Sequence, residues 1–153
     1  MVWNHPENVN GGIPVRCRGV ARLAAWQVWQ RATGRPFTVR TADGLRLKCY
    51  PHSPQASAVI YTGMPEYRDV HFVRDYLTAG DRFIDVGANV GVFTLTVASV
   101  AGSVVEAFEP SSTAFPRLVE NIELNLLGAR VHAHRAAIGR EPGTVHLTLG
   151  WMR

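Results

Sequence analysis

The stretch Asp81–Leu95, DRFIDVGANVGVFTL, constrains the fold of this 153-residue chain more than any other. It opens with a short apolar run, Phe83–Val86, which has the length and composition of a buried strand. A turn with two glycines follows at Gly87–Gly91, and Val92–Ala98 is then long enough for a helix. A strand, a glycine-rich turn and a helix are the first part of a nucleotide-binding βαβ unit. The sequence therefore predicts an α/β domain with a ligand at the end of this strand.

Two residues of the turn favour S-adenosylmethionine over a dinucleotide. In the dinucleotide fingerprint a second glycine lets the backbone meet a pyrophosphate, and Asn89 occupies that position here. Asp85, inside the strand, would repel a pyrophosphate but attract the ammonium of S-adenosylmethionine. Gly87 and Gly91 would allow a tight turn and a close approach of the ligand to the backbone. The alternatives are an NAD-binding domain and a purely structural turn with a capping Asn89.

A second sequence feature of a nucleotide-binding unit lies on the next predicted strand, Val104–Pro110, which reads VVEAFEP. Its carboxylate, Glu109, follows the glycine turn at about the 20-residue distance where a nucleotide ribose is hydrogen-bonded. A carboxylate accepts charge-assisted hydrogen bonds from both ribose hydroxyls. The alternative is a solvated charge at the end of a strand.

Three segments together resemble the FkbM family of S-adenosylmethionine-dependent methyltransferases. They are FIDVGANVGVFTL, VVEAFEPSSTAFPRLVENIELN and the AAIG of residues 136–139, within a resemblance that covers roughly Phe37 to Leu149. The resemblance implies a Rossmann-like class I methyltransferase fold. It also implies methyl transfer to a hydroxyl of a sugar or secondary metabolite. The expected partner is therefore a small-molecule hydroxyl acceptor, with no nucleic acid.

These interpretations predict a cofactor site around the two strand ends, made of Glu66, Asp85, Gly87, Ala88, Asn89, Gly91, Glu109, Pro110 and Ala136. The resemblance places Glu66 near the cofactor, whereas stabilisation of a helix dipole is its alternative role. A hydroxyl acceptor would benefit from a general base. Chemistry alone offers Glu66, His52 and His71, and the base stays unassigned.

The fold is expected to be partial, because the sheet of that family continues beyond the third strand, where this chain stops. We expect a methyltransferase domain at residues 37–153, preceded by an extension at residues 1–36 with one helix, Arg16–Ala32. A β-hairpin around Asp43–Gly44 would open the domain. A truncated, non-catalytic remnant is the alternative to an active enzyme.

Missing strands would leave the glycine-motif strand, Arg82–Val86, as an open sheet edge. We also expect apolar residues of the following helix to be exposed, namely Val92, Phe93 and Val97. The chain alone is therefore expected to self-associate or aggregate, and to lack methyl transfer.

Further elements follow from periodicity: a helix starting at Pro65 and ending before Gly80, a helix over Phe115–Leu126 capped by Ser111–Thr113, a third strand over Arg130–Ala136 and one more strand over Thr144–Leu149.

Composition agrees with a cytoplasmic globular protein. No apolar run approaches a membrane span, and no signal peptide or metal-ligand spacing is present. Cys17 and Cys49 are expected to be free thiols. Residues 1–50 hold eight basic residues against two acidic ones. Such an arm can bind an anionic surface, but a solvated extension is the interpretation that we favour from sequence.

Overall fold

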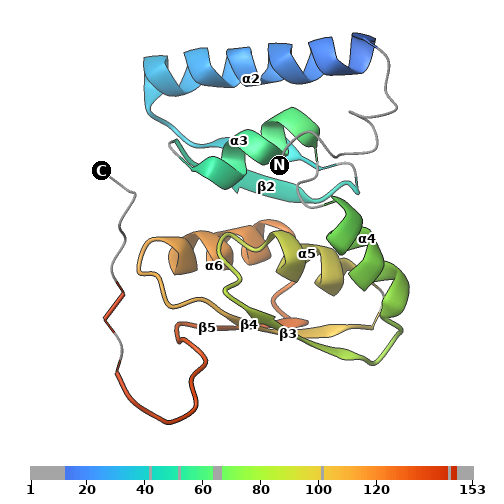
Figure 1. The fold of residues 1–153 in the computed structure, drawn as a ribbon, viewed down its shortest axis with the longest axis vertical. Coiled ribbons are helices and arrows are strands. Elements are labelled where there is room, and N and C mark those ends of the chain that lie inside the picture. Colours follow the sequence, from blue (N-terminus) through green and yellow to red (C-terminus); the bar gives the residue numbers. More distant parts are fainter. Residues whose placement is uncertain are drawn as a thin grey trace. The chain divides into compact units, whose positions relative to one another are not determined.

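The computed structural model describes residues 13–41, 43–51, 53–63, 67–100, 102–144 and 146–147 (Figure 1). The chain divides into two compact units, Met1–Leu77 and Thr78–Arg153. The predicted boundary at residue 36 stays a prediction. Two candidates for the general base, His52 and Glu66, lie outside the described residues.

The N-terminal unit contains the predicted helix and hairpin. Its elements are α2 (Ile13–Thr33), β1 (Phe37–Arg40), β2 (Arg46–Cys49), α3 (Pro54–Thr62) and α4 (Tyr67–Tyr76). Gly44 has a φ of 82°, which only glycine adopts without strain, and it lets β1 and β2 pair as an antiparallel hairpin. Helix α3 was not predicted from the sequence. Its signal is Ser53, whose side chain accepts from the N–H of Ala56, followed by a proline in the first helical turn.

Small and apolar side chains hold this unit together. A Cβ on Gly19 of α2 would lie 3.0 Å from the carbonyl oxygen of Tyr61, so glycine lets α2 lie close against α3. Val39 and Leu47 face each other across the hairpin and are both buried. Cys49 is also buried, which raises the pKa of its thiol to about 12 and keeps it protonated.

The C-terminal unit is a series of β–α repeats that forms two layers, one parallel sheet and the helices on one of its faces. Its elements are β3 (Arg82–Val86), α5 (Val92–Ser99), β4 (Val104–Phe108), α6 (Ala114–Leu124) and β5 (Val131–His134). The strands are parallel in the order β3-β4-β5, and α5 and α6 lie on one face of the sheet (Figure 1). This is the predicted Rossmann-like fold, with β5 as its last strand among the described residues.

The prediction of a strand over Thr144–Leu149 is wrong for the described residues of that segment. Thr144, His146 and Leu147 have no strand structure, and the rest of that segment lies outside the described residues. Leu147 is exposed, which agrees with the absence of a strand at this residue. An alternating pattern forms a strand only where the segment can pair with a sheet edge and pack on an apolar surface.

The predicted open edge is present, since β3 pairs only with β4 among the described strands. The expected exposure of the helix is wrong: Val97 is buried, and Val92 and Phe93 are half-buried, because α5 lies on the covered face. The exposed apolar residues of β3 are Ile84 and Val86, which lie on the other face of the sheet at 62% and 61% exposure. Self-association of the chain stays a prediction.

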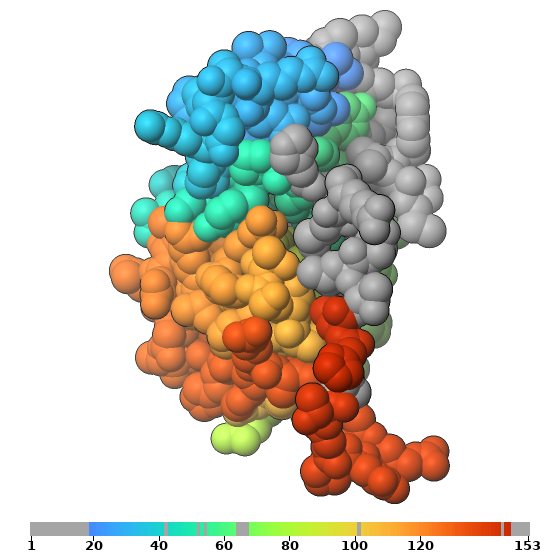
Figure 2. All heavy atoms as spheres, turned by 90° about the vertical axis from the view of Figure 1, so that its left-hand side faces the viewer, coloured from blue at the N-terminus to red at the C-terminus, as the bar shows by residue number. Residues whose placement is uncertain are grey.

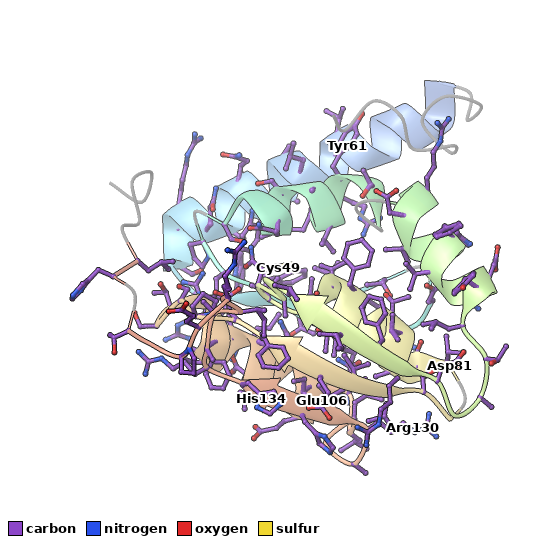
Figure 3. All side chains as sticks on the ribbon, turned by 60° about the horizontal axis from the view of Figure 1, so that its bottom comes forward. Cys49, Tyr61, Asp81, Glu106, Arg130 and His134 are labelled. Atoms are coloured by element: carbon purple, nitrogen blue, oxygen red, sulfur yellow. The ribbon has the colours of Figure 1, made fainter. Side chains whose placement is uncertain are left out.

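The same uncovered face carries a small polar cluster. Glu106 of β4 bonds to Nδ1 of His132 at 2.9 Å and to Nε2 of His134 at 2.7 Å. Figure 3 shows Glu106 and His134 beside each other on the sheet. These bonds, first from His134 and then from His132, lower the pKa of Glu106.

Among the described helices, none is long and apolar enough to cross a membrane.

Candidate cofactor site

The turn after β3 is fastened to the end of β4 by its backbone. The N–H groups of Gly87 and Ala88 both donate to the carbonyl oxygen of Phe108, at 2.9 and 3.0 Å. Gly87, Asn89 and Gly91 all have positive φ, at 81°, 51° and 95°. Asn89 is one of the few non-glycine residue types that adopt this conformation readily. The sequence thus dictates a turn that reverses sharply between β3 and α5.

Glycine fits the two positions of the turn for different physical reasons. A Cβ on Gly91 would lie 2.8 Å from Cδ1 of Leu118, so that position is filled by packing against α6. A Cβ on Gly87 would meet nothing within 4 Å. Of the two predicted sites of close ligand approach, Gly87 alone faces open space.

Glu109 lies at the carboxyl end of β4 and reaches the glycine turn. Its Oε2 accepts from the N–H of Asn89 at 2.8 Å, and its Oε1 accepts from the N–H of Ser111 at 2.8 Å. The side chain is buried, with 7% exposure. Ser111 in turn accepts from the N–H of Ala114 and so caps α6, as predicted for this segment. The structure therefore brings Asn89 and Glu109, which the sequence predicted separately, into one site.

Asp85 lies inside β3 beneath the start of α5. Its Oδ2 accepts from Oγ1 of Thr94, in the first turn of α5. The N-cap of α5 is Gly91, so the alternative of a capping Asn89 is wrong. Burial raises the pKa of Asp85, and the nearby charge of Glu109 adds to this effect, while the bonds from Thr94 offset part of it.

Asn121 is a positioning residue that the sequence analysis missed. It is fully buried on α6, and its Nδ2 donates to the carbonyl oxygen of Val90 at 2.9 Å. The bond holds the second half of the glycine turn against α6. The signal in the sequence was a polar residue on the apolar stripe of a helix, between Leu118 and Ile122.

The remaining predicted residues lie around these contacts. Ala88 is buried, Pro110 is half-buried, and Ala136 is exposed just beyond β5. The N–H groups of Glu109 and Ala136 both donate to the carbonyl oxygen of His134, at 3.0 and 2.9 Å. His71 is half-buried on α4, in the other unit. The described residues contain no group of three or more side chains that could hold a metal ion.

No family model matches this sequence, and no curated protein matches it either. Solved structures do. TYW2 of P. horikoshii, in complex with MeSAdo, matches with a TM-score of 0.57 and 17% identity over 80% of this chain and 50% of that chain. The candidate transferase PH0793 of Pyrococcus horikoshii matches with a TM-score of 0.55 and 17% identity over 77% and 48%. The complex of aTrm5 and tRNALeu matches with a TM-score of 0.50 and 18% identity over 68% and 28%.

These neighbours confirm the fold and correct the expected partner. The structural neighbours are S-adenosylmethionine-dependent methyltransferases, so the Rossmann-like methyltransferase fold is shown. The chain spans about half the length of the first two structures, and less of the third. Membership of the FkbM family is not confirmed. The expectation of a small-molecule acceptor without nucleic acid is contradicted by aTrm5, which was solved with a tRNA. It failed because the motifs that carry the resemblance predict a cofactor site and contain no information about the acceptor.

Proposed function

We propose that this chain carries the S-adenosylmethionine-binding part of a methyltransferase, and that the methyl acceptor is RNA. One observation carries the proposal: the buried carboxylate of Glu109 contacts the glycine turn at the neighbouring ends of two parallel strands. In open α/β sheets, ligands bind beyond the carboxyl ends of the strands.

Glu109 retains the capacity to hold a ribose. An ionised carboxylate has about four acceptor positions. The N–H groups of Asn89 and Ser111 use one position on each oxygen. Two ribose hydroxyls can therefore donate to Glu109 while both backbone hydrogen bonds persist. Gly87, with open space where a side chain would be, allows the ligand to approach the turn.

Asp85 suits the methionyl end of the cofactor. Burial penalises its charged form, and a cationic ligand would reverse that penalty by favouring ionisation. An ammonium placed near Asp85 would gain a counter-ion in a poorly solvated site. This chemistry separates S-adenosylmethionine from NAD, whose pyrophosphate would be repelled by Asp85.

The bound cofactor would supply an activated methyl group on a sulfonium. The chain's residues would bind and orient it and exclude water, which is most of what a displacement of this kind requires. An RNA acceptor is supported by the neighbour that was solved with a tRNA and by the charge of the N-terminal unit. That unit holds ten basic residues against five acidic ones, whereas the C-terminal unit holds six against seven.

Calorimetric titration with S-adenosylhomocysteine and, separately, with NAD tests the cofactor. We expect binding of S-adenosylhomocysteine and none of NAD; the reverse result would assign a dinucleotide-binding domain. Glu106→Gln is a matched control for Glu109→Gln, because Glu106 lies on the uncovered face of the same strand. Only the Glu109 variant should weaken binding of S-adenosylhomocysteine.

Fluorescence anisotropy with a labelled, unmodified tRNA transcript tests the acceptor class. Binding of the transcript in a salt-dependent manner is expected, because a basic protein surface releases counterions from RNA. A chain that binds S-adenosylhomocysteine but no RNA would keep the cofactor assignment and exclude this acceptor.

A further inference from the structure

We propose that two copies of this chain pair through the open edge of β3, across a two-fold axis that passes beside Ile84. The proposal is independent of the proposed function, because it concerns only one strand and its backbone. Among the described strands β3 pairs with β4 alone, while β1 and β2 form a separate sheet with each other. An unpaired strand at the side of a sheet is a template for pairing with another strand. The partner strand that we propose is β3 of a second copy.

The hydrogen bonds between β3 and β4 show which backbone groups remain unpaired. The carbonyl oxygen of Asp81 accepts from the N–H of Val104, and the N–H of Gly87 donates to the carbonyl oxygen of Phe108. Because backbone groups along a strand alternate in direction, the odd-numbered residues of β3 face β4 and the even-numbered residues face the open side. The residues whose N–H and C=O groups face the open side are Arg82, Ile84 and Val86.

The side chains at this edge also favour contact with a second chain. Ile84 and Val86 are apolar and are exposed on the uncovered face of the sheet. Phe83, on the covered face, is only half-buried. The strand contains neither proline nor lysine, two residue types that protect open edges from pairing. Pairing at the edge would therefore remove apolar surface from water on both faces of the sheet.

The opposite edge of the sheet is less suited to pairing. Strand β5 has four residues, and after it the N–H of Ala136 turns back to the carbonyl oxygen of His134. Figure 2 shows this side of the C-terminal unit, where β5 and the segment after it, coloured orange to red, contribute to the surface. Both histidines of β5 bond to Glu106 on the uncovered face. Stacking two sheets face to face would bury this polar cluster, which opposes that alternative.

Hydrogen bonding restricts how two β3 strands can be aligned. In an antiparallel pair, directly opposite residues exchange both N–H···O bonds at every second position. A residue that faces the open side must therefore oppose a residue that also faces the open side. With Ile84 opposite Ile84, Arg82 of each copy opposes Val86 of the other, and all three residues exchange both groups. The contact uses the same surface of both copies, so it closes as a dimer.

Charge selects this alignment over the neighbouring ones. A shift by two residues in one direction would place Asp85 opposite Asp85. The same shift in the other direction would place Asp81 opposite Asp85. Like charges directly opposite each other destabilise an antiparallel pair. In the alignment about Ile84, Asp85 opposes Phe83 instead, and no two like charges are directly opposite.

Light scattering and sedimentation velocity of the whole chain, over a range of protein concentrations, test the pairing. We expect a concentration-dependent dimer, because an edge of five residues per copy is a small interface. Ile84→Lys places two ammonium groups opposite each other at the axis, and should raise the dissociation constant about tenfold or more. Leu126→Lys is the matched control, since it replaces an exposed leucine after α6 and should leave the dimer unchanged. Far-UV circular dichroism shows that both variants are folded.

A disulfide between copies reports the alignment itself. Opposite residues that exchange hydrogen bonds in an antiparallel pair have Cα atoms about 5.5 Å apart, which a disulfide can span. Ile84→Cys should therefore give a covalent dimer under mild oxidation. Val86→Cys should not, because Val86 opposes Arg82 of the other copy. The wild-type chain is oxidised in parallel, since it already contains Cys17 and Cys49.

Distinct results would overturn the proposal. A wild-type chain that is monomeric at every concentration would show that the edge of β3 does not pair. A dimer that Ile84→Lys leaves intact would form through another surface, and larger aggregates would contradict a closed pair. Equal cross-linking of the two cysteine variants would exclude this alignment. The measurements contain no S-adenosylhomocysteine and no RNA, so their failure would leave the proposed function unaffected.

Discussion

The backbone N–H of Asn89 donates to Oε2 of Glu109 at 2.8 Å, which joins the glycine turn after β3 to the carboxyl end of β4. The carboxylate thus shapes the turn in addition to offering acceptors for a ligand. Since Glu109 also accepts from the N–H of Ser111, three segments meet at one side chain. Cofactor affinity and stability should therefore change together when Glu109 is replaced.

Glu109→Ala should lower both quantities. Two backbone N–H groups would lose a buried acceptor, which should lower the free energy of unfolding by about 1–3 kcal/mol. Binding of S-adenosylhomocysteine should lose about 1.5–3 kcal/mol, as expected for charge-assisted hydrogen bonds. Urea unfolding and calorimetry measure the two effects. A folded variant with undiminished affinity would remove Glu109 from the site.

Alanine substitutions should separate the two glycines of the turn. Gly91→Ala combines a positive φ of 95° with a contact of 2.8 Å to Leu118, and should destabilise the chain by about 2 kcal/mol or more. Gly87→Ala has the backbone strain alone, at about 1–2 kcal/mol. Thermal melts compare the two stabilities. Equal melting temperatures would show that Leu118 moves aside without cost.

For ligand affinity the order should be the opposite: Gly87→Ala should weaken binding more than Gly91→Ala. Gly87 faces open space, so an added methyl group would hinder the cofactor more than one at Gly91, where α6 already fills the position. Titration of both variants with S-adenosylhomocysteine, at a temperature where both are folded, tests this. If only Gly91→Ala loses affinity, the turn serves packing alone.

The glycine turn, the acidic end of β4 and the sheet itself could be predicted because they depend on local patterns. The run Phe83–Val86 followed by glycines specifies a strand and a turn whatever surrounds it. The role of Gly91 could not be predicted, since it depends on Leu118, a residue of another helix that packs on it. For the same reason the sequence did not show that the side chain of Asp85 accepts from the hydroxyl of Thr94 in the first turn of α5.

Asn121 should be required for the shape of the turn. Asn121→Ala removes its bond to the carbonyl oxygen of Val90 and leaves a cavity in a fully buried position. We expect a loss of about 1–3 kcal/mol in stability and weaker binding of S-adenosylhomocysteine. Asn125→Ala is the control: Asn125 is the C-cap of α6, and its side-chain amide donates to the backbone carbonyl of Asn121 and not to the glycine turn. Equal effects of the two variants on ligand affinity would argue against positioning by Asn121.

Asp85 should oppose stability while it supports binding. Burial raises its pKa, so the folded chain binds this proton more tightly than the unfolded chain does. Stability then falls as the pH rises from about 4, the ordinary pKa of an aspartate, through the raised value. Asp85→Asn keeps an acceptor for Thr94 without the charge. It should therefore melt at a higher temperature than wild type at pH 7, and the difference should shrink as the pH is lowered.

Asp81 provides a control of opposite sign for this prediction. The backbone N–H and then the hydroxyl of Thr78 donate to Asp81 and lower its pKa. Its contribution to stability is present above pH 4 and lost as the pH falls, so Asp81→Asn should lower the melting temperature at pH 7. Ligand binding separates the two residues further. Only Asp85→Asn should weaken the binding of S-adenosylhomocysteine, because the ammonium of the ligand would lose its counter-ion. A lower melting temperature for Asp85→Asn at pH 7 would show that its charged bonds to Thr94 outweigh the cost of burial.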